Sequence, residues 1–93
     1  MNPATPTALI LGIEHFVARK LVDKILASDI NVIGVGDYVP GLSQGENILI
    51  KNSLEEVYDL PVNYVFDFIG SAEVWKKAEI DGAKLGRAFM KAG

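Results

Sequence analysis

The stretch that decides the fold lies near the start of the chain, at residues 7–18, and reads TALILGIEHFVA. Its first part is apolar on both faces of an extended chain, which is typical of a buried parallel strand. Gly12 ends that run, and the apolar residues then recur with the helical period as far as residue 28. The sequence therefore predicts a buried strand followed by an amphipathic helix, whose sheet-facing stripe includes Val17, Leu21 and Ile25.

The same alternation of apolar runs and helical segments continues along the chain. Strands are predicted at 31–35, 47–50 and 62–69, a loop at 38–46, a brief helix at 54–58 and a long helix at about 72–92. Strands that alternate with helices imply right-handed crossovers and a parallel sheet in the order 3-2-1-4. The predicted class is α/β: a Rossmann-like sheet with flanking helices, the N-terminal part of a doubly wound fold. It covers residues 7–93 and is preceded by a flexible tail at residues 1–6.

The composition excludes several classes of function. The 93 residues are 49% hydrophobic and 23% charged, which suits one small globular domain. A net charge of −3 with scattered Lys and Arg gives no reason to expect nucleic acid as a partner. The absence of Cys and the single histidine, His15, exclude disulfides, thiol catalysis and clusters of Cys or His around a metal. No signal peptide or apolar run of about 20 residues is present, so we expect a cytoplasmic protein without a membrane span.

The turn after the first strand lies where a dinucleotide-binding fingerprint belongs, and here the sequence resembles a known family. The run at residues 9–22, LILGIEHFVARKLV, is similar to the opening of the extended short-chain dehydrogenase/reductases. It is most similar to the NDP-sugar epimerase/dehydratase branch, whose opening reads T-G-x-x-G-F-I-G-x-x-L. The likeness continues downstream and spans about residues 7 to 92, with further matches at residues 32–35, 52–55, 63–70 and 80–83.

The resemblance implies that the chain is the NAD-binding segment of such a protein, with NADP not excluded. The cofactor would lie at the carboxyl ends of the strands, where the strand order reverses. Asp37 would then contact the ribose and Asn52 would lie near the adenine. The cofactor-binding residues implied in this way are Gly12, His15, Phe16, Val17, Asp37, Asn52, Ile69 and Gly70.

The glycine fingerprint departs from the family pattern at the positions that face the cofactor. Of its three glycines only Gly12 remains, because His15 and Ala18 stand at the second and third positions. A histidine side chain at the second position crowds the approach of the pyrophosphate unless the loop shifts. Glu14 adds a carboxylate that suits the helix dipole and repels a diphosphate. His15 also fits a plain exposed loop residue, and Gly12 a turn glycine.

The polar positions of the expected site also differ from the family. Gly36 stands where the family has the acid that holds the ribose, and Asp37 comes one residue later. Asn52 replaces an aspartate on the adenine side, and Asp67 replaces a histidine in the fourth strand. Asp37 and Asn52 also fit ordinary loop or cap residues, and Asp67 fits either a cap at the strand end or a site carboxylate.

No catalytic residue is predicted in this chain, so the sequence leaves its status as an enzyme open. The family transfers hydride with a Tyr-x-x-x-Lys pair, and Leu, Val or Phe follows four residues after each tyrosine here. We expect the substrate and catalytic residues to lie beyond residue 93. An alternative is that the chain is an experimental truncation of a longer protein, in which case its exposed sheet edge favours self-association.

A second alternative is a degenerate Rossmann-like domain that has lost its cofactor and acts in assembly or regulation. The altered fingerprint favours it, and so does the predicted last helix, whose stripe includes Trp75 and Phe89. Gly82 and Gly86 would lie one turn apart on that helix and permit close helix packing, against another subunit or against the chain's own sheet. We therefore expect a homo-oligomer, formed through the last helix or through an exposed sheet edge.

Overall fold

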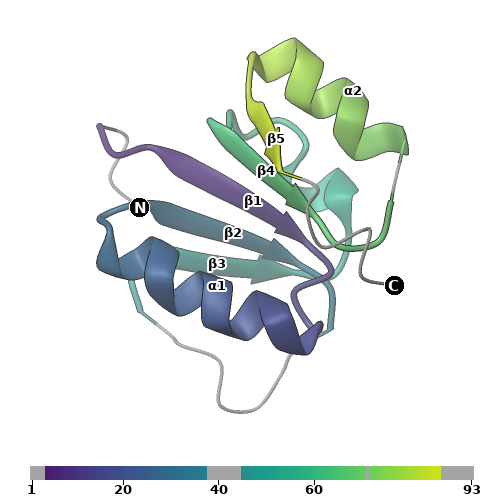
Figure 1. Ribbon diagram of the computed structural model, residues 1–93. Coiled ribbons are helices and arrows are strands. Elements are labelled where there is room, and N and C mark those ends of the chain that lie inside the picture. Colours follow the sequence, from purple (N-terminus) through teal and green to yellow (C-terminus); the bar gives the residue numbers. More distant parts are fainter. Residues whose placement is uncertain (1–3, 38–44, 71, 87–93) are drawn as a thin grey trace.

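In the computed structural model, which describes residues 4–37, 45–70 and 72–86, the strands form one parallel sheet (Figure 1). The sheet has five strands within these described ranges, in the order β3-β2-β1-β4-β5. The predicted order 3-2-1-4 is confirmed, and β5 is an addition at the edge next to β4. The elements are β1 (Thr7–Leu11), α1 (Phe16–Ala27), β2 (Asn31–Val35), β3 (Ile48–Lys51), the 3-10 helix η1 (Leu54–Val57), β4 (Tyr64–Asp67), α2 (Ala72–Asp81) and β5 (Lys84–Gly86).

The central strand explains why the first apolar run has no polar face. β1 pairs with β2 on one side and with β4 on the other, so Leu9 lies between Ile33 and Val65. The pleat sends successive side chains to opposite faces of the sheet, and both faces of β1 are covered. Leu9 belongs to one apolar cluster and Ile10 to the other.

One face of the sheet is packed against α1, which lies across the strands in Figure 1. The buried positions of α1 are Ala18, Val22 and Ile25. The prediction that Val17 faces the sheet is wrong, because 38% of its surface is exposed. The buried stripe therefore begins at Ala18, while Ile25 is buried as predicted and Leu21 packs against the same apolar cluster.

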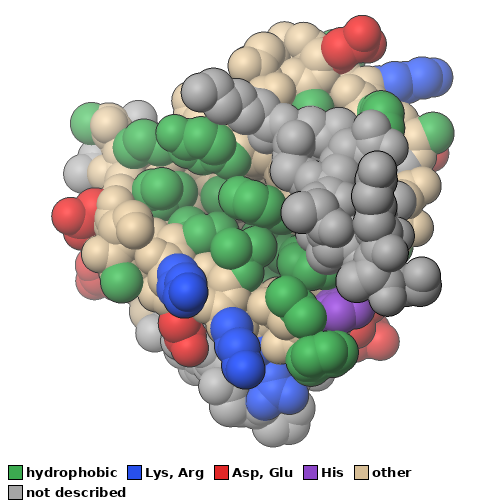
Figure 2. Space-filling model, viewed as in Figure 1, with side chains coloured by type: hydrophobic (Ala, Val, Ile, Leu, Met, Phe, Trp, Pro, Cys, Tyr) green, Lys and Arg blue, Asp and Glu red, His purple; other side chains and the backbone are tan. Residues whose placement is uncertain are grey.

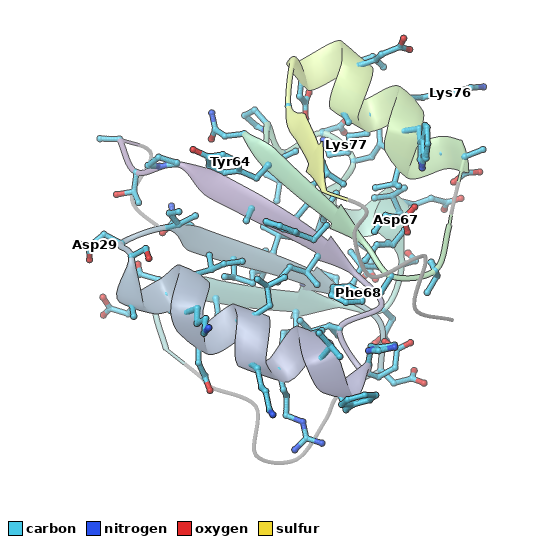
Figure 3. The ribbon with its side chains drawn as sticks, in the orientation of Figure 1. Asp29, Tyr64, Asp67, Phe68, Lys76 and Lys77 are labelled. Atoms are coloured by element: carbon cyan, nitrogen blue, oxygen red, sulfur yellow. The ribbon has the colours of Figure 1, made fainter. Side chains whose placement is uncertain are left out.

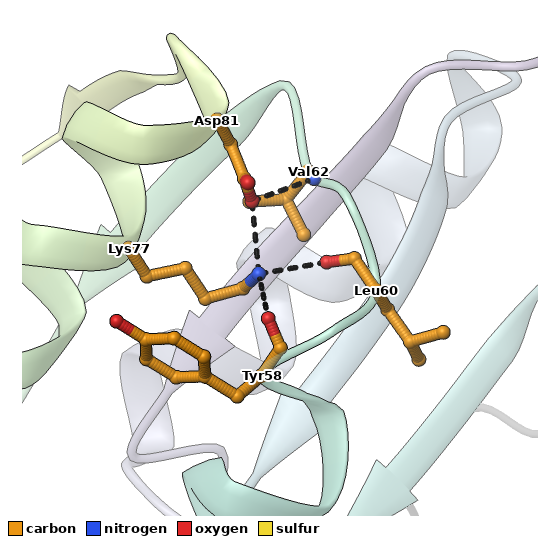
Figure 4. Close-up of polar contacts among 5 residues, drawn as sticks. All are labelled: Tyr58, Leu60, Val62, Lys77 and Asp81. Carbon is orange, nitrogen blue, oxygen red and sulfur yellow. Dashed lines mark hydrogen bonds and ion pairs between the residues drawn. The ribbon is translucent and has the colours of Figure 1, made fainter.

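The opposite face is covered by η1 and α2, and a buried lysine fastens these elements together. Lys77 of α2 is only 1% exposed, and its Nζ donates to the backbone oxygens of Tyr58 at 2.7 Å and Leu60 at 2.8 Å (Figure 4). It also pairs with Asp81 Oδ2 at 2.8 Å, and the same oxygen accepts from Val62 N at 3.1 Å. The chain that enters β4 is therefore tied to α2 through one ammonium and one carboxylate.

The predicted long helix at 72–92 is wrong, because α2 ends at Asp81. Gly82 adopts a left-handed conformation with φ of 64°, its N–H donates to Glu79 O, and Ala83 N donates to Ala78 O at 2.8 Å. These two bonds form a Schellman motif, the glycine-based end of a helix. Gly82 therefore terminates the helix instead of packing against another one.

The chain after Gly82 forms β5, so the proposed contact of Gly82 and Gly86 on one helix face does not exist. Gly86 lies in β5, where it pairs with Phe66 of β4. The predicted stripe also fails at Trp75, which is 36% exposed, and Phe89 lies outside the described residues. The close helix packing expected from Gly82 and Gly86 is therefore not formed, and β3 and β5 are the edges of the described sheet.

Half-buried aromatic residues line β4 on the same side of the sheet as α1. Tyr64, Phe66 and Phe68 pack against the buried cluster beneath α1. Figure 2 shows hydrophobic side chains gathered on this face above α1. Neither helix of the described ranges has the length and apolar character that a membrane crossing requires.

The start of the sheet is tied together by backbone and amide groups. Asn31 N donates to Pro6 O at 2.8 Å, and Asn63 N donates to Thr7 O at 2.8 Å. In return, Thr7 N donates to the side-chain oxygen of Asn63 at 2.9 Å. Pro6 is thus joined to β2 directly before β1 begins. The first three residues of the predicted tail, and most of the predicted loop at 38–46, lie outside the described residues.

Candidate functional site

The turns that follow β1 and β4 touch each other at Gly12. Gly12 has φ of 90°, and an added Cβ would lie 3.0 Å from both Phe68 Cβ and Ile69 Cγ2. The N–H groups of Gly12 and Ile13 both donate to Val35 O, at 2.8 and 3.0 Å, which joins this turn to the end of β2. Glycine is favoured at position 12, because the backbone angle strains any other residue and an added Cβ would press on Phe68 and Ile69.

His15 caps the N-terminus of α1. Its backbone is extended, with φ of −65° and ψ of 135°, so the loop holds a side chain there without left-handed strain. Its Nδ1 accepts a hydrogen bond from Val17 N at 3.2 Å. The imidazole stacks on Phe16, with ring centroids 5.0 Å apart, and on Phe68, at 5.1 Å. Because Nδ1 is the acceptor, the proton of the neutral ring sits on Nε2, which is a hydrogen-bond donor.

Glu14 lies over the end of β2, not over the first turn of α1. An added Cβ at Gly36 would overlap Glu14 Oε2 and lie 3.1 Å from Ile13 N. Gly36 has φ of 144° and its N–H donates to Lys51 O at 2.9 Å. The Glu14 carboxylate thus fills the volume that a side chain at position 36 would take.

The residues expected on the ribose and adenine side follow the neighbouring strands β2 and β3. Asp37 is exposed directly after Gly36, and among the described residues its carboxylate forms no hydrogen bond or ion pair. Asn52 follows β3 and is also exposed, and its backbone N–H donates to Glu56 Oε2 at 3.1 Å. That carboxylate also accepts from Ser53 N at 3.1 Å, which caps η1.

The structure therefore divides the predicted residues between two places at the carboxyl ends of the strands. The first surrounds the switch between β1 and β4, and the second lies at the ends of β2 and β3, where Val35 pairs with Lys51. In Figure 1 the carboxyl ends of these four strands lie together. The first group comprises Gly12, His15, Phe16, Val17, Ile69 and Gly70, and the second comprises Asp37 and Asn52.

Asp67 organises the turn after β4, and both of its oxygens are used within the chain. It is fully buried, and its Oδ1 accepts from Ile69 N at 3.0 Å and Gly70 N at 2.8 Å. Its Oδ2 accepts from Trp75 Nε1 at 3.2 Å. Figure 3 shows Asp67 and Phe68 side by side at this end of β4. Of the two roles considered for Asp67, the structure supports the cap.

Two members of this edge were not among the predicted site residues. Phe68 stacks on His15, and the sequence offered no sign of this contact because the two residues belong to different turns. Glu14 was noted only for its charge near the helix. Gly36 was a signal that could have been used, since a glycine at a strand end leaves room for a side chain from another segment.

A separate polar hollow lies at the other end of the sheet, where the strands begin. Its volume is about 370 Å³, and it is lined by Thr5, Asp29, Asn31 and Asn47. Among the described residues Asp29 is the one ionisable group that lines it, so this part of the lining offers no pair of groups for acid–base or metal chemistry. Within residues 4–37, 45–70 and 72–86, no three His, Asp or Glu side chains gather to hold a metal ion.

Comparison of the chain with models of protein families, with curated proteins and with solved structures finds no match. The function proposed below is therefore based on the geometry of the residues at the carboxyl ends of the strands, called the carboxyl edge.

Proposed function

We propose that this chain is a Rossmann-like nucleotide-binding domain, the N-terminal segment of a protein similar to the NDP-sugar epimerases and dehydratases. NAD(H) is the proposed ligand of its carboxyl edge. The observation that carries the proposal is the contact between the turns of β1 and β4 at Gly12. In open parallel sheets ligands bind outside the carboxyl ends of the strands, at the point where the strand order reverses.

The residues at the switch offer groups that suit a dinucleotide. Gly12 keeps the β1 turn free of a side chain, and Phe16 and Ile69 offer apolar surface, being 70% and 63% exposed. His15 already takes the N–H of Val17, which would otherwise be available to a phosphate. Its Nε2–H supplies a donor in exchange, so in this proposal the pyrophosphate contacts the imidazole as well as the helix start.

The proposed role of the chain is binding, since no residue of the hydride-transfer pair is present in its sequence. When bound, the nicotinamide would supply the hydride chemistry of the whole protein. Gly70 completes the β4 side of the site, and Asp37 and Asn52 lie toward its ribose and adenine side. NADP is the alternative dinucleotide.

Ligand-dependent thermal unfolding tests the proposal directly. The chain is heated with and without millimolar NAD, NADH, NADP and UDP-glucose, with Trp75, the single tryptophan, as the optical probe. A ligand at about 100 times its Kd stabilises a folded protein by about 2.7 kcal/mol. For a domain of this size that raises Tm by several degrees. The absence of a shift with all three dinucleotides would refute the proposal.

A His15→Ser variant shows where the ligand binds. Serine is a good N-cap residue, so the free protein should lose only the stacking of the imidazole on Phe16 and Phe68, about 0.5–1.5 kcal/mol. The Nε2 donor is lost, so the shift caused by NAD should shrink. An unchanged shift would place the ligand away from α1.

One observation favours a domain that has lost its cofactor. The hydrogen bond between His15 Nδ1 and Val17 N closes part of the helix N-terminus that binds anions in dinucleotide-binding folds. In that case the chain would act in assembly or regulation, and its oligomer would be indifferent to nucleotides. Sedimentation equilibrium with and without NAD separates the two proposals, because only the assembly domain forms a stable oligomer that no dinucleotide alters.

A further inference from the structure

A carboxylate from the loop before α1 lies where a side chain at the end of β2 would be. Gly36 ends β2 without a side chain, and the Glu14 carboxylate occupies the space of its Cβ. The two residues belong to different segments, the loop before α1 and the end of β2. An acid at the end of the second strand of a dinucleotide-binding sheet accepts a hydrogen bond from the ribose 2′-hydroxyl.

From this arrangement we propose that Glu14 is the residue that recognises the ribose and selects NAD(H) over NADP(H). The inference rests on the proposed function, since it assigns a specificity to the same site. A carboxylate at this point accepts hydrogen bonds from the hydroxyls of an unphosphorylated ribose. The same carboxylate repels a 2′-phosphate, which carries up to two negative charges.

The backbone around Glu14 is held firmly enough to position its side chain. Ile13 is fully buried, and its side chain fills the space above Gly34, where an added Cβ would lie 2.9 Å from Ile13 Cγ1. Ile13 N is bonded to Val35 O, and His15 N donates to Gly12 O at 3.0 Å. The residues on both sides of Glu14 are thus anchored, so its side chain starts from a fixed point beside β2.

Asp37 is the other acid near this strand end, and the structure gives it a weaker claim. Like Glu14, it is exposed and its carboxylate has no hydrogen bond or ion pair among the described residues, but only the Glu14 carboxylate is found in the space beside Gly36. Glu14, by contrast, lies at the strand end itself. Gly36 is part of this arrangement, because a side chain at position 36 would displace the Glu14 carboxylate.

The test compares the Kd values of NAD and NADP by titration calorimetry for the full chain and three variants. Glu14→Gln removes the charge and keeps the shape, and Asp37→Asn does the same at the competing acid. Glu79→Gln is the matched control, since Glu79 is exposed on α2 near the opposite edge of the sheet. We expect the original chain to bind NAD at least about tenfold more tightly than NADP, a difference of about 1.4 kcal/mol.

Glu14→Gln should lower this preference to near one, mainly by strengthening the binding of NADP, whereas Glu79→Gln should leave it unchanged. A preference that survives Glu14→Gln, or that is lost in Asp37→Asn instead, would overturn the assignment to Glu14 while leaving the binding site intact. Failure of the original chain to bind either dinucleotide would overturn both the proposed function and this inference.

Gly36→Ala gives a second readout that keeps Glu14 in the chain. The added methyl group would displace the carboxylate, so the variant should lose the NAD preference as Glu14→Gln does. Combining the two changes should have no further effect on the preference, because both act through one group. Thermal unfolding checks that each variant is folded, since the φ of 144° makes alanine at position 36 strained. Additive effects of the two changes on the preference would contradict the inference.

Discussion

Replacing Lys77 with methionine removes a buried ammonium group while keeping most of the length of its apolar stem. In the native protein this ammonium makes three short contacts, to Tyr58 O at 2.7 Å, Leu60 O at 2.8 Å and Asp81 Oδ2 at 2.8 Å. After the change, two backbone oxygens lose a donor, and the Asp81 side chain, only 14% exposed, loses its cation. Asp81 keeps its bond from Val62 N.

The size of the effect follows from the uncompensated groups that remain. Breaking a buried ion pair by removing one partner costs about 3–5 kcal/mol. A domain of 93 residues has a total free energy of unfolding of about 5–14 kcal/mol, at 0.05–0.15 kcal/mol per residue. Lys77→Met should therefore remove a large part of the stability. The unfolding should begin where η1 and the chain before β4 meet α2.

Urea unfolding followed by circular dichroism and by the fluorescence of Trp75 measures this loss. Lys76→Met is the matched control, since Lys76 is exposed on the same helix and points away from Lys77 (Figure 3). We expect the control to change the free energy of unfolding by less than about 0.5 kcal/mol. A loss for Lys77→Met of under about 1 kcal/mol, similar to that of the control, would refute the assigned role of the buried ammonium.

Two further predictions concern the turns at the carboxyl edge. In Asp67→Asn an amide N–H replaces one of the two oxygens, so either Gly70 N or Trp75 Nε1 loses its acceptor. The change should lower the free energy of unfolding by about 1–3 kcal/mol and shift the emission of Trp75. Unchanged emission together with native stability would contradict the role of Asp67 as a cap. Gly34→Ala should cost about 1–3 kcal/mol by forcing its Cβ against Ile13. The cost should fall in an Ile13→Ala background, and an equal cost in both backgrounds would show that this contact does not limit position 34.

The strand prediction succeeded where the signal was local. β1 and β2 occupy the predicted residues 7–11 and 31–35, because both are almost entirely apolar and both faces of the sheet are covered, with Asn31 as the one buried polar residue of these two strands. The helix after β1 was also predicted, but its buried stripe begins at Ala18 and not at Val17, while Ile25 is buried as predicted. The order 3-2-1-4 followed from the alternation of strands and helices and from the right-handed crossover.

The error at residues 72–92 has an identifiable cause. Helical periodicity continued past Gly82, and that glycine was read as a small packing residue. Its left-handed conformation and the bond from Ala83 N to Ala78 O make it the end of α2. β5 is only three residues long, so its pairing with β4 decides its structure, and no pattern within three residues predicts it.

The candidate site shows the same division between local pattern and tertiary contact. Its position at the carboxyl ends of the strands was predictable from topology, and Gly12 was predictable from the turn. The stacking of His15 on Phe68, the cover of Gly36 by Glu14 and the capture of Lys77 by Tyr58 and Leu60 were not predictable.

The amino-acid pattern alone thus determines the α/β class, the parallel sheet and the edge at which a ligand is expected, because periodicity and glycine punctuation act between neighbouring residues. The tertiary structure decides which groups at that edge are available to a ligand. Both oxygens of Asp67 are taken by its own turn and His15 Nδ1 caps the helix start, which leaves His15 Nε2–H and the Glu14 carboxylate beside β2 as the groups open to a ligand. The position of Glu14 beside Gly36 and the stacking of His15 on Phe68 join segments distant in sequence, so packing decides them.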